Sequence, residues 1–97
     1  MFIHVAIHQP YPEKADLLAA SMERFGRAMM GKPGFQRVFV LRDQQTGSLL
    51  GLAMWDSVTD WHAARSAMIA AVQDDPIGEW ELQVPEVYHL DVLWSSD

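Results

Sequence analysis

Apolar side chains recur at every second position near both ends of the chain. Ile3, Val5 and Ile7 alternate with other residues over Phe2–His8, and a similar alternation runs over Val87–Trp94. This is the period of a β-strand, in which successive side chains point to opposite faces. The pattern therefore predicts a first and a last strand.

Two segments between these strands have apolar residues at helical spacing. The first runs from Pro12 to about Met30 and is stopped by Gly31 and Pro33, a combination that ends helices. Pro12 suits the first helical position. The apolar face of this predicted helix consists of Leu18, Met22, Phe25 and Met29.

The second helical segment opens with a capping box. The Ser57 hydroxyl is expected to accept the Asp60 amide, and the Asp60 carboxylate to reach back to the Ser57 amide. The helix is predicted to close near Asp75–Pro76, and a linker with Trp80 and Pro85 leads to the last strand. Its apolar face consists of Trp61, Ala64, Met68 and Val72.

Two more strand-like runs, Phe35–Arg42 and Ser48–Asp56, are joined by the polar segment Asp43–Gly47, which suits a hairpin loop. With right-handed crossovers, the order strand, helix, strand, strand, helix, strand predicts a ferredoxin-like α+β fold. We expect one domain over residues 1–97 with a four-stranded antiparallel sheet and both helices on one face. The first strand should lie beside the third and the fourth.

Both faces of this predicted sheet are apolar. In the second strand, one face should carry Phe35, Phe39 and Leu41 and the other Val38 and Val40. In the third strand, Leu50, Leu52 and Met54 should lie opposite to Leu49, Ala53 and Trp55. In the last strand, Tyr88, Leu90, Val92 and Trp94 should lie opposite to Val87 and Leu93. Helices cover only one face, and apolar surface left in water forfeits stability. We therefore expect a homodimer that buries the other face.

Composition excludes several classes of function. The net charge is −6 with scattered Lys and Arg, which disfavours nucleic-acid binding. There is no cysteine, so no disulfide framework or thiolate site can form. No apolar run is long enough for a membrane span, and the first nine residues lack a basic leader. We expect a cytoplasmic protein that binds neither nucleic acid nor membrane.

The sequence resembles the antibiotic biosynthesis monooxygenase family of the dimeric α+β barrel group. The resemblance spans all four strands and is most specific in Leu52–Ser57, followed by Asp60 and Trp61, and in the step Lys32–Phe35. It implies the fold and the dimer described above. It also implies a monooxygenase of the quinone-forming kind, a haem-degrading enzyme, or a domain without known activity.

The resemblance assigns some residues and excludes others. In quinone-forming members, residues at the positions of Trp55 and Trp61 line or adjoin the substrate cavity. Gly51 stands where those members have an asparagine. The haem-degrading members need an asparagine on the first strand and a histidine late in the second helix, but this sequence has no asparagine and that helix has no histidine after His62. We therefore expect no haem and no other bound cofactor.

Three histidines and one aspartate interrupt the otherwise apolar strands. His4 and His8 share one face of the first strand, and His89 and Asp91 share one face of the last. If these strands are neighbours, all four side chains can point into one space. A histidine there can serve as general base for a phenolic substrate, since it titrates near neutral pH.

Trp55 and Trp61 would then hold an aromatic ring, and Arg65, one turn beyond Trp61, could pair with an anionic substrate. Asp91 would also contact the substrate. In the alternative interpretation these residues and the histidines are structural. A metal site is disfavoured because no ligand motif is present.

Two functions remain open. The first is cofactor-independent oxidation of a small aromatic or polycyclic substrate by O2, with His4, His8 or His89 as base. The second is a non-catalytic dimeric domain that binds a small ligand or supports a partner. An enzyme needs a cavity of at least about 300 Å³ that a histidine reaches. The alternative predicts that the space is filled by Phe25, Met29, Trp55 and Met68.

Overall fold

The computed structural model describes all 97 residues, and its elements follow the predicted order with two short additions. The strands are β1 (Phe2–His8), β2 (Phe35–Arg42), β3 (Leu49–Trp55) and β4 (Glu86–Asp91). The helices are a 3₁₀ turn, η1 (Pro12–Lys14), then α1 (Ala15–Arg27), α2 (Val58–Ala71) and α3 (Ile77–Trp80).

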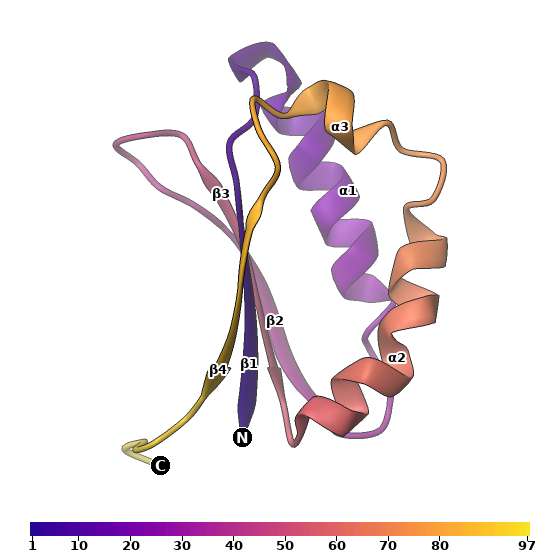
Figure 1. Ribbon diagram of the computed structural model, residues 1–97, viewed down its shortest axis with the longest axis vertical. Coiled ribbons are helices and arrows are strands. Elements are labelled where there is room, and N and C mark those ends of the chain that lie inside the picture. Colours follow the sequence, from indigo (N-terminus) through magenta and orange to yellow (C-terminus); the bar gives the residue numbers. More distant parts are fainter.

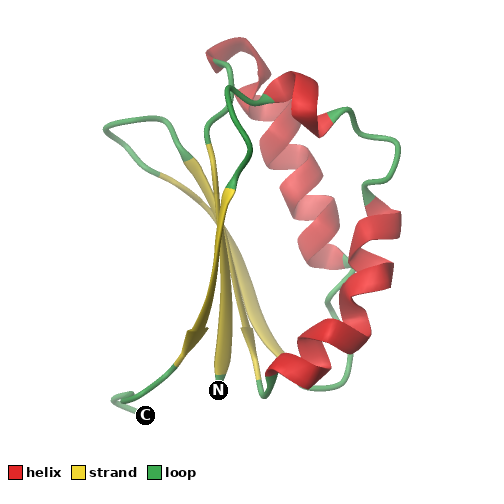
Figure 2. Cartoon of the chain, viewed as in Figure 1, coloured by secondary structure: helices red, strands yellow, loops and turns green.

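The four strands form one antiparallel sheet in the order β2-β3-β1-β4. This confirms that the first strand lies between the third and the fourth. The helices cover one face of the sheet and leave the other face bare (Figure 1). Figure 2 shows the same two layers, strands on one side and helices on the other. None of the helices is long and apolar enough to cross a membrane.

A β-bulge near the start of β2 changes which face one predicted residue occupies. Phe35 pairs with Trp55, but Arg37 pairs with Met54, so the register shifts by one residue between them. The bulge places Phe35 toward the helices, where it packs on the core. The prediction that Phe35 shares a face with Phe39 and Leu41 is therefore wrong. The remaining residues of β2 alternate as expected.

The last strand is shorter than predicted. β4 ends at Asp91, and just beyond it the Val92 amide donates to the Met1 carbonyl at 3.2 Å. Trp94, expected within the strand, lies beyond it with 81% of its surface exposed. The ladder with β1 ends at the pair of Phe2 and Asp91, and local alternation cannot reveal where pairing with a remote strand ends.

The helix ends also differ from the predictions. α1 ends at Arg27, and the residues up to Gly31 continue as turns closed by the Met29 amide donating to the Gly26 carbonyl. α2 ends at Ala71, four residues before the predicted stop, since Val72 has left helical geometry. The predicted linker contains the one-turn helix α3.

Tertiary contacts hold the segment after α2 against α1. The Asp75 carboxylate accepts hydrogen bonds from the Ser21 hydroxyl and the Arg24 guanidinium, both at 2.7 Å. Trp80 of α3 is buried against Leu18 and neighbouring residues. These contacts give the segment a structure that its own sequence does not favour.

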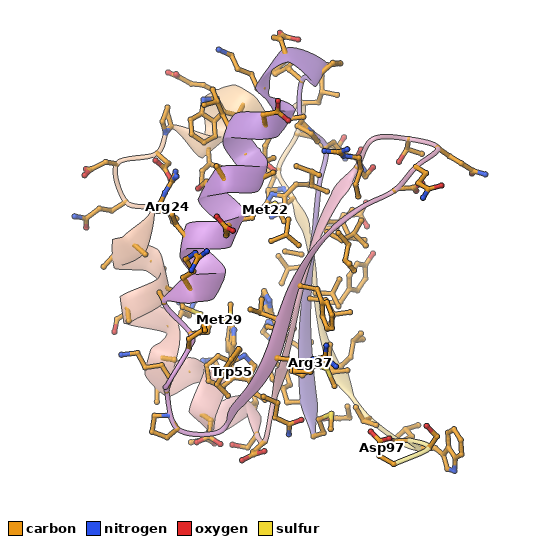
Figure 3. All side chains as sticks on the ribbon, turned by 180° about the vertical axis from the view of Figure 1, so that it is seen from behind. Met22, Arg24, Met29, Arg37, Trp55 and Asp97 are labelled. Atoms are coloured by element: carbon orange, nitrogen blue, oxygen red, sulfur yellow. The ribbon has the colours of Figure 1, made fainter.

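The core consists of two clusters between the layers. The larger contains Phe2, Met29, Ala53, Trp55, Trp61, Ala64 and Met68. The smaller contains Leu18, Met22, Leu49 and Trp80. Figure 3 shows Met22 on α1, Met29 in the turn that follows α1 and Trp55 on the sheet, all directed into the space between the layers.

The capping box at the start of α2 forms with one difference from the prediction. The Ser57 Oγ accepts the Asp60 amide at 3.2 Å, as expected. The Asp60 carboxylate, however, accepts from the Ser57 hydroxyl at 2.9 Å and not from its amide. The cap fixes the start of α2, and so the position of Trp61 one turn later.

Candidate functional site

An apolar cavity of about 230 Å³ lies between the sheet and α1. Thirteen of its 18 lining residues are hydrophobic. It is smaller than the volume expected for an enzyme, but two histidines line it. Phe25 and Met29 form part of its wall and do not fill it, whereas Trp55 and Met68 are fully buried elsewhere in the core.

The register of β1 places both cavity histidines. His4 pairs with Ala53 and His8 with Leu49, and these two partners are buried on the helix-facing side of β3. Because side chains on one strand repeat every second residue, His4 and His8 both face the helices, roughly 13 Å apart along the strand. The cavity therefore has one imidazole toward each end.

His8 is held by a partner far away in the sequence. Its Nδ1 donates a hydrogen bond to the Glu81 carboxylate, a contact that is also an ion pair when His8 is protonated. Only 14% of the His8 side chain and 3% of the Glu81 side chain are exposed. Glu81 does not itself line the cavity. Figure 3 shows the space between α1 and the sheet from behind, with Met22 directed into it.

Backbone pairing brings Glu81 to this position. The segment after α3 runs beside the segment after β1, where Glu81 forms an isolated bridge with Pro10. The Tyr11 amide donates to the Trp80 carbonyl at 2.9 Å, and the Leu82 amide to the Gln9 carbonyl at 2.7 Å. Glu81 is thus fixed on both sides by main-chain hydrogen bonds, which makes its carboxylate a rigid partner for His8.

His4 belongs to an aromatic cluster at the opposite end. Its ring stacks on Trp61 at 4.8 Å between centroids and lies 5.2 Å from His89. His89 also packs edge-on against Trp61 and Phe2, at 4.9 and 5.4 Å. The Arg65 guanidinium lies 5.9 Å from the Trp61 ring. Of the predicted site residues, this cluster unites His4, His89, Trp61 and Arg65.

The pKa of His4 is lowered from 6.5 to about 4, chiefly by burial within this cluster and then by the nearby His89 and Arg65. Each of these effects disfavours a positive charge on the ring. His4 is therefore neutral at neutral pH. It can accept or donate a hydrogen bond, but it is a weak acceptor of a proton.

Two predicted site residues stay outside both groups. Asp91 is exposed at the end of β4, opposite Phe2, and no hydrogen bond or ion pair joins it to a histidine. Trp55 packs against Phe35 at 5.4 Å and does not reach the cavity. The indole N–H groups of Trp55 and Trp61 are buried without an acceptor.

Sequence reasoning missed Glu81. It lies 73 residues from His8 in a segment that reads as a linker, and nothing in its local pattern marks it. A glutamate flanked by Trp80 and Leu82 is only a weak hint of burial. No group of three or more His, Cys, Asp or Glu side chains is close enough to hold a metal ion.

Neither a known family model nor a curated protein sequence matches this chain. Solved structures do match over nearly the full length. Rv0793 from Mycobacterium tuberculosis superposes with a TM-score of 0.84 at 15% identity, covering 99% of this chain and 98% of that one. A Deinococcus radiodurans protein assigned to the antibiotic biosynthesis monooxygenases superposes with a TM-score of 0.81 at 16% identity, covering 100% of this chain and 97% of that one.

A variant of SnoaB, a cofactor-independent oxygenase from Streptomyces nogalater, superposes with a TM-score of 0.80 at 13% identity, covering 98% of this chain and 95% of that one. Identities this low establish the fold alone, since one fold supports many functions. The resemblance read from the sequence is thereby confirmed: this chain has the fold of the antibiotic biosynthesis monooxygenase family.

Proposed function

We propose that the protein is a cofactor-independent monooxygenase that oxidises a small aromatic substrate, of quinol or anthrone type, with O2. The observation that carries the proposal is an apolar cavity between sheet and helices with two imidazoles in its wall. The shared fold with SnoaB, which is named as a cofactor-independent oxygenase, supports it. Such a reaction requires a cavity that excludes water and a base within reach of the substrate.

The chemistry needs only the substrate and O2. A histidine removes the proton of a phenolic or enolic O–H, and the resulting anion passes one electron to O2. The ring radical and superoxide combine at carbon, and the peroxide formed loses water. A ring CH2 thus becomes C=O, with one oxygen atom in the product and the other in water, so atoms and electrons balance without another reductant.

The size of the cavity limits the substrate. Ligand pockets for drug-sized molecules measure about 300–1,000 Å³, and this cavity measures about 230 Å³. Within the proposed substrate class we therefore expect quinols with one or two rings, such as dihydroxynaphthalenes, to react in preference to the three-ring anthrones. The cationic Arg65 behind His4 favours a ligand that carries negative charge.

The other substrate-binding residues have different roles in this proposal. Trp61 supports the His4 ring by stacking on it, and so acts on a ligand through that ring. Trp55 and Asp91 lie beyond the cavity wall, so they contact a substrate only if it extends past the present lining. We rank them after the histidines as targets for mutation.

Oxygen uptake tests the proposal. Native protein should consume O2 above background with at least one member of a panel of dihydroxynaphthalenes and anthrones. His8→Ala should reduce the rate by about 10²-fold or more, the usual contribution of a general base. His62→Ala, a change at an exposed histidine outside the cavity, is the matched control and should keep the rate. No uptake by native protein with any compound would overturn the proposal.

The alternative function is a non-catalytic domain that binds a small ligand or supports a partner. The small volume of the cavity favours it over an enzyme for large substrates. It predicts that aromatic compounds bind, as measured by quenching of tryptophan fluorescence, while no O2 is consumed. Binding together with uptake would exclude this alternative.

We further propose that the protein is a homodimer in which the open faces of two sheets pack together. The open face of the central strands is wholly apolar: Ile3, Val5 and Ile7 on β1 and Leu50, Leu52 and Met54 on β3. Charged side chains on this face lie only on the edge strands, namely Arg37 on β2 and Glu86 on β4. An apolar centre with a polar rim is the usual anatomy of a protein interface.

A further inference from the structure

We infer that His8 is the general base of the cavity, that Glu81 is its positioning residue, and that the cavity binds aromatic ligands with an ionisable O–H as their anions. This inference rests on the proposed function for its catalytic part. Its binding part stands independently, because deprotonation of a bound ligand requires no oxygen chemistry.

The hydrogen bond to Glu81 determines which nitrogen of His8 is available. An ionised carboxylate only accepts, so the shared hydrogen lies on Nδ1 and the lone pair on Nε2. No other hydrogen bond is made by the His8 ring. The imidazole lines the cavity while Glu81 does not, so the ring separates carboxylate from ligand. This is the arrangement in which a carboxylate orients a histidine base.

Burial makes the pair interdependent. With 3% of its side chain exposed, the Glu81 carboxylate has lost nearly all contact with water. A buried carboxylate is costly unless it is paired and hydrogen-bonded, and His8 is the partner that the structure provides. A proton taken up by the His8 ring comes to lie directly beside this carboxylate, within one hydrogen-bonded pair.

Neither of the other candidate histidines combines these features. His4 lines the cavity, but its lowered pKa of about 4 makes it a poor proton acceptor, and Arg65 and His89 are its charged neighbours. His89 is exposed and does not line the cavity. Only His8 both lines the cavity and has a carboxylate as its hydrogen-bond partner.

The proposed step moves one proton. The O–H bond of the ligand breaks, an N–H bond forms at His8 Nε2, and the ligand keeps the electron pair as an anion. Before and after the step the three groups together carry a single negative charge. The imidazolium ends between two anions, so no unpaired charge is created in the apolar cavity.

A nitrophenol tests this step without oxygen, because its anion absorbs visible light and its neutral form does not. Under argon, at a pH where free nitrophenol is mostly neutral, native protein should bind it and show the absorption of the anion. Glu81→Gln should reduce the fraction bound as anion by roughly tenfold or more, since a hydrogen bond to a charged group is lost. Nitroanisole, which lacks the O–H, should show no spectral change.

Two further variants keep the test decisive. His8→Gln can still donate an N–H to Glu81 but cannot accept the proton, so it should bind nitrophenol only in the neutral form. His62→Ala is the matched histidine control and should behave as native protein. Thermal unfolding followed by circular dichroism checks each fold, and His8→Gln carries the test if Glu81→Gln does not fold.

The tautomer of the His8 ring is a further readout, because it would not change if Glu81 had only a structural role. In native protein, ¹⁵N NMR of His8 should show the hydrogen on Nδ1. In Glu81→Gln the side-chain amide can also donate a hydrogen bond to His8 Nδ1. A substantial fraction of the His8 rings should then carry the hydrogen on Nε2. Equal tautomer populations in both proteins, or equal binding of the nitrophenol anion by both, would overturn the positioning role of Glu81.

The outcomes separate this inference from the proposed function. In one outcome, native protein binds the nitrophenol anion, His8→Gln does not, and native protein takes up no O2 with any substrate. This outcome upholds the inference and rejects the oxygenase. O2 uptake that His8→Gln leaves unchanged upholds the oxygenase and rejects His8 as base. Absence of nitrophenol anion in native protein also rejects the inference.

Discussion

At the scale of single residues, the environment of His4 sets its charge. The ring is stacked on Trp61 and lies near two groups that are or can become positive, His89 and Arg65. Burial is the largest cause of its lowered pKa, followed by these neighbours. Protonation of His4 in the folded state is therefore more costly than in the unfolded chain, and stability becomes linked to pH.

We predict that the free energy of unfolding decreases as the pH falls from about 6.5 toward 4. In this window the unfolded chain binds a proton at His4, with its pKa near 6.5, while the folded state with a pKa of about 4 does not. Acid therefore favours unfolding. Urea midpoints measured at several pH values in native protein and His4→Phe check this. His4→Phe keeps an aromatic ring against Trp61 and should show a flatter profile between pH about 6.5 and 5, and identical profiles would refute the assignment.

At the scale of elements, one glycine couples the entry of β2 to the start of α2. Gly34 has a φ of 79°, a left-handed conformation that suits glycine. Its carbonyl accepts the Asp56 amide at 2.8 Å, directly before the Ser57 cap. A Cβ on Gly34 would lie 2.7 Å from the Cβ of Asp60 and even closer to its carboxylate.

We predict that Gly34→Ala destabilises the protein more than Gly31→Ala does. Gly31 has a similar φ of 80°, but nothing lies within 4 Å of an added Cβ, so only backbone strain of about 1–2 kcal/mol applies. At Gly34 the clash also displaces Asp60, and a lost helix cap costs about another 1 kcal/mol. Urea denaturation of both variants gives the difference. Equal decreases in the free energy of unfolding of the two variants would show that the contact with Asp60 is easily relieved.

At the scale of the whole molecule, the fold leaves one layer of the sheet uncovered. Large apolar side chains on this face remain open to water, among them Leu41 at 41% exposure and Tyr88 and Leu90 at 45% each. At roughly 25 cal/mol per Å² of apolar surface, covering such a face stabilises a small domain substantially. The C-terminal segment after β4 ends on the side of the sheet away from the helices (Figure 1), and Trp94 in this segment is 81% exposed.

We predict that native protein sediments with twice the 11.0 kDa mass of the chain at micromolar concentration. Leu52→Lys, at the centre of the open face opposite Val5, should give the mass of one chain, because a buried unpaired charge is costly. Leu17→Lys changes an exposed leucine on α1 and should leave the mass unchanged. A folded native protein with the mass of a single chain would contradict the homodimer.

Local patterns in the sequence were enough to predict β1 and β2 with their observed ends, the capped start of α2, and the sheet order. Alternation and caps act between near neighbours, and the handedness of crossovers restricts how four strands can connect. The boundaries that were wrong depend on remote partners. β4 stops where its ladder with β1 ends, at the pair of Phe2 and Asp91, and the segment of Trp80 packs against Leu18 of α1.

In the functional site, too, some features follow from the local sequence and others from contacts between remote segments. The sequence by itself determined that His4 and His8 share one face of β1, because the pleat of a strand fixes this. That this face is the one covered by the helices was decided by the tertiary structure, which pairs His4 and His8 with the buried Ala53 and Leu49. Only the tertiary structure decided their environments. It paired His8 with Glu81 across 73 residues and surrounded His4 with Trp61 and His89. Burial and charge act through space, so these two imidazoles acquired different chemistry from positions that look equivalent along the chain.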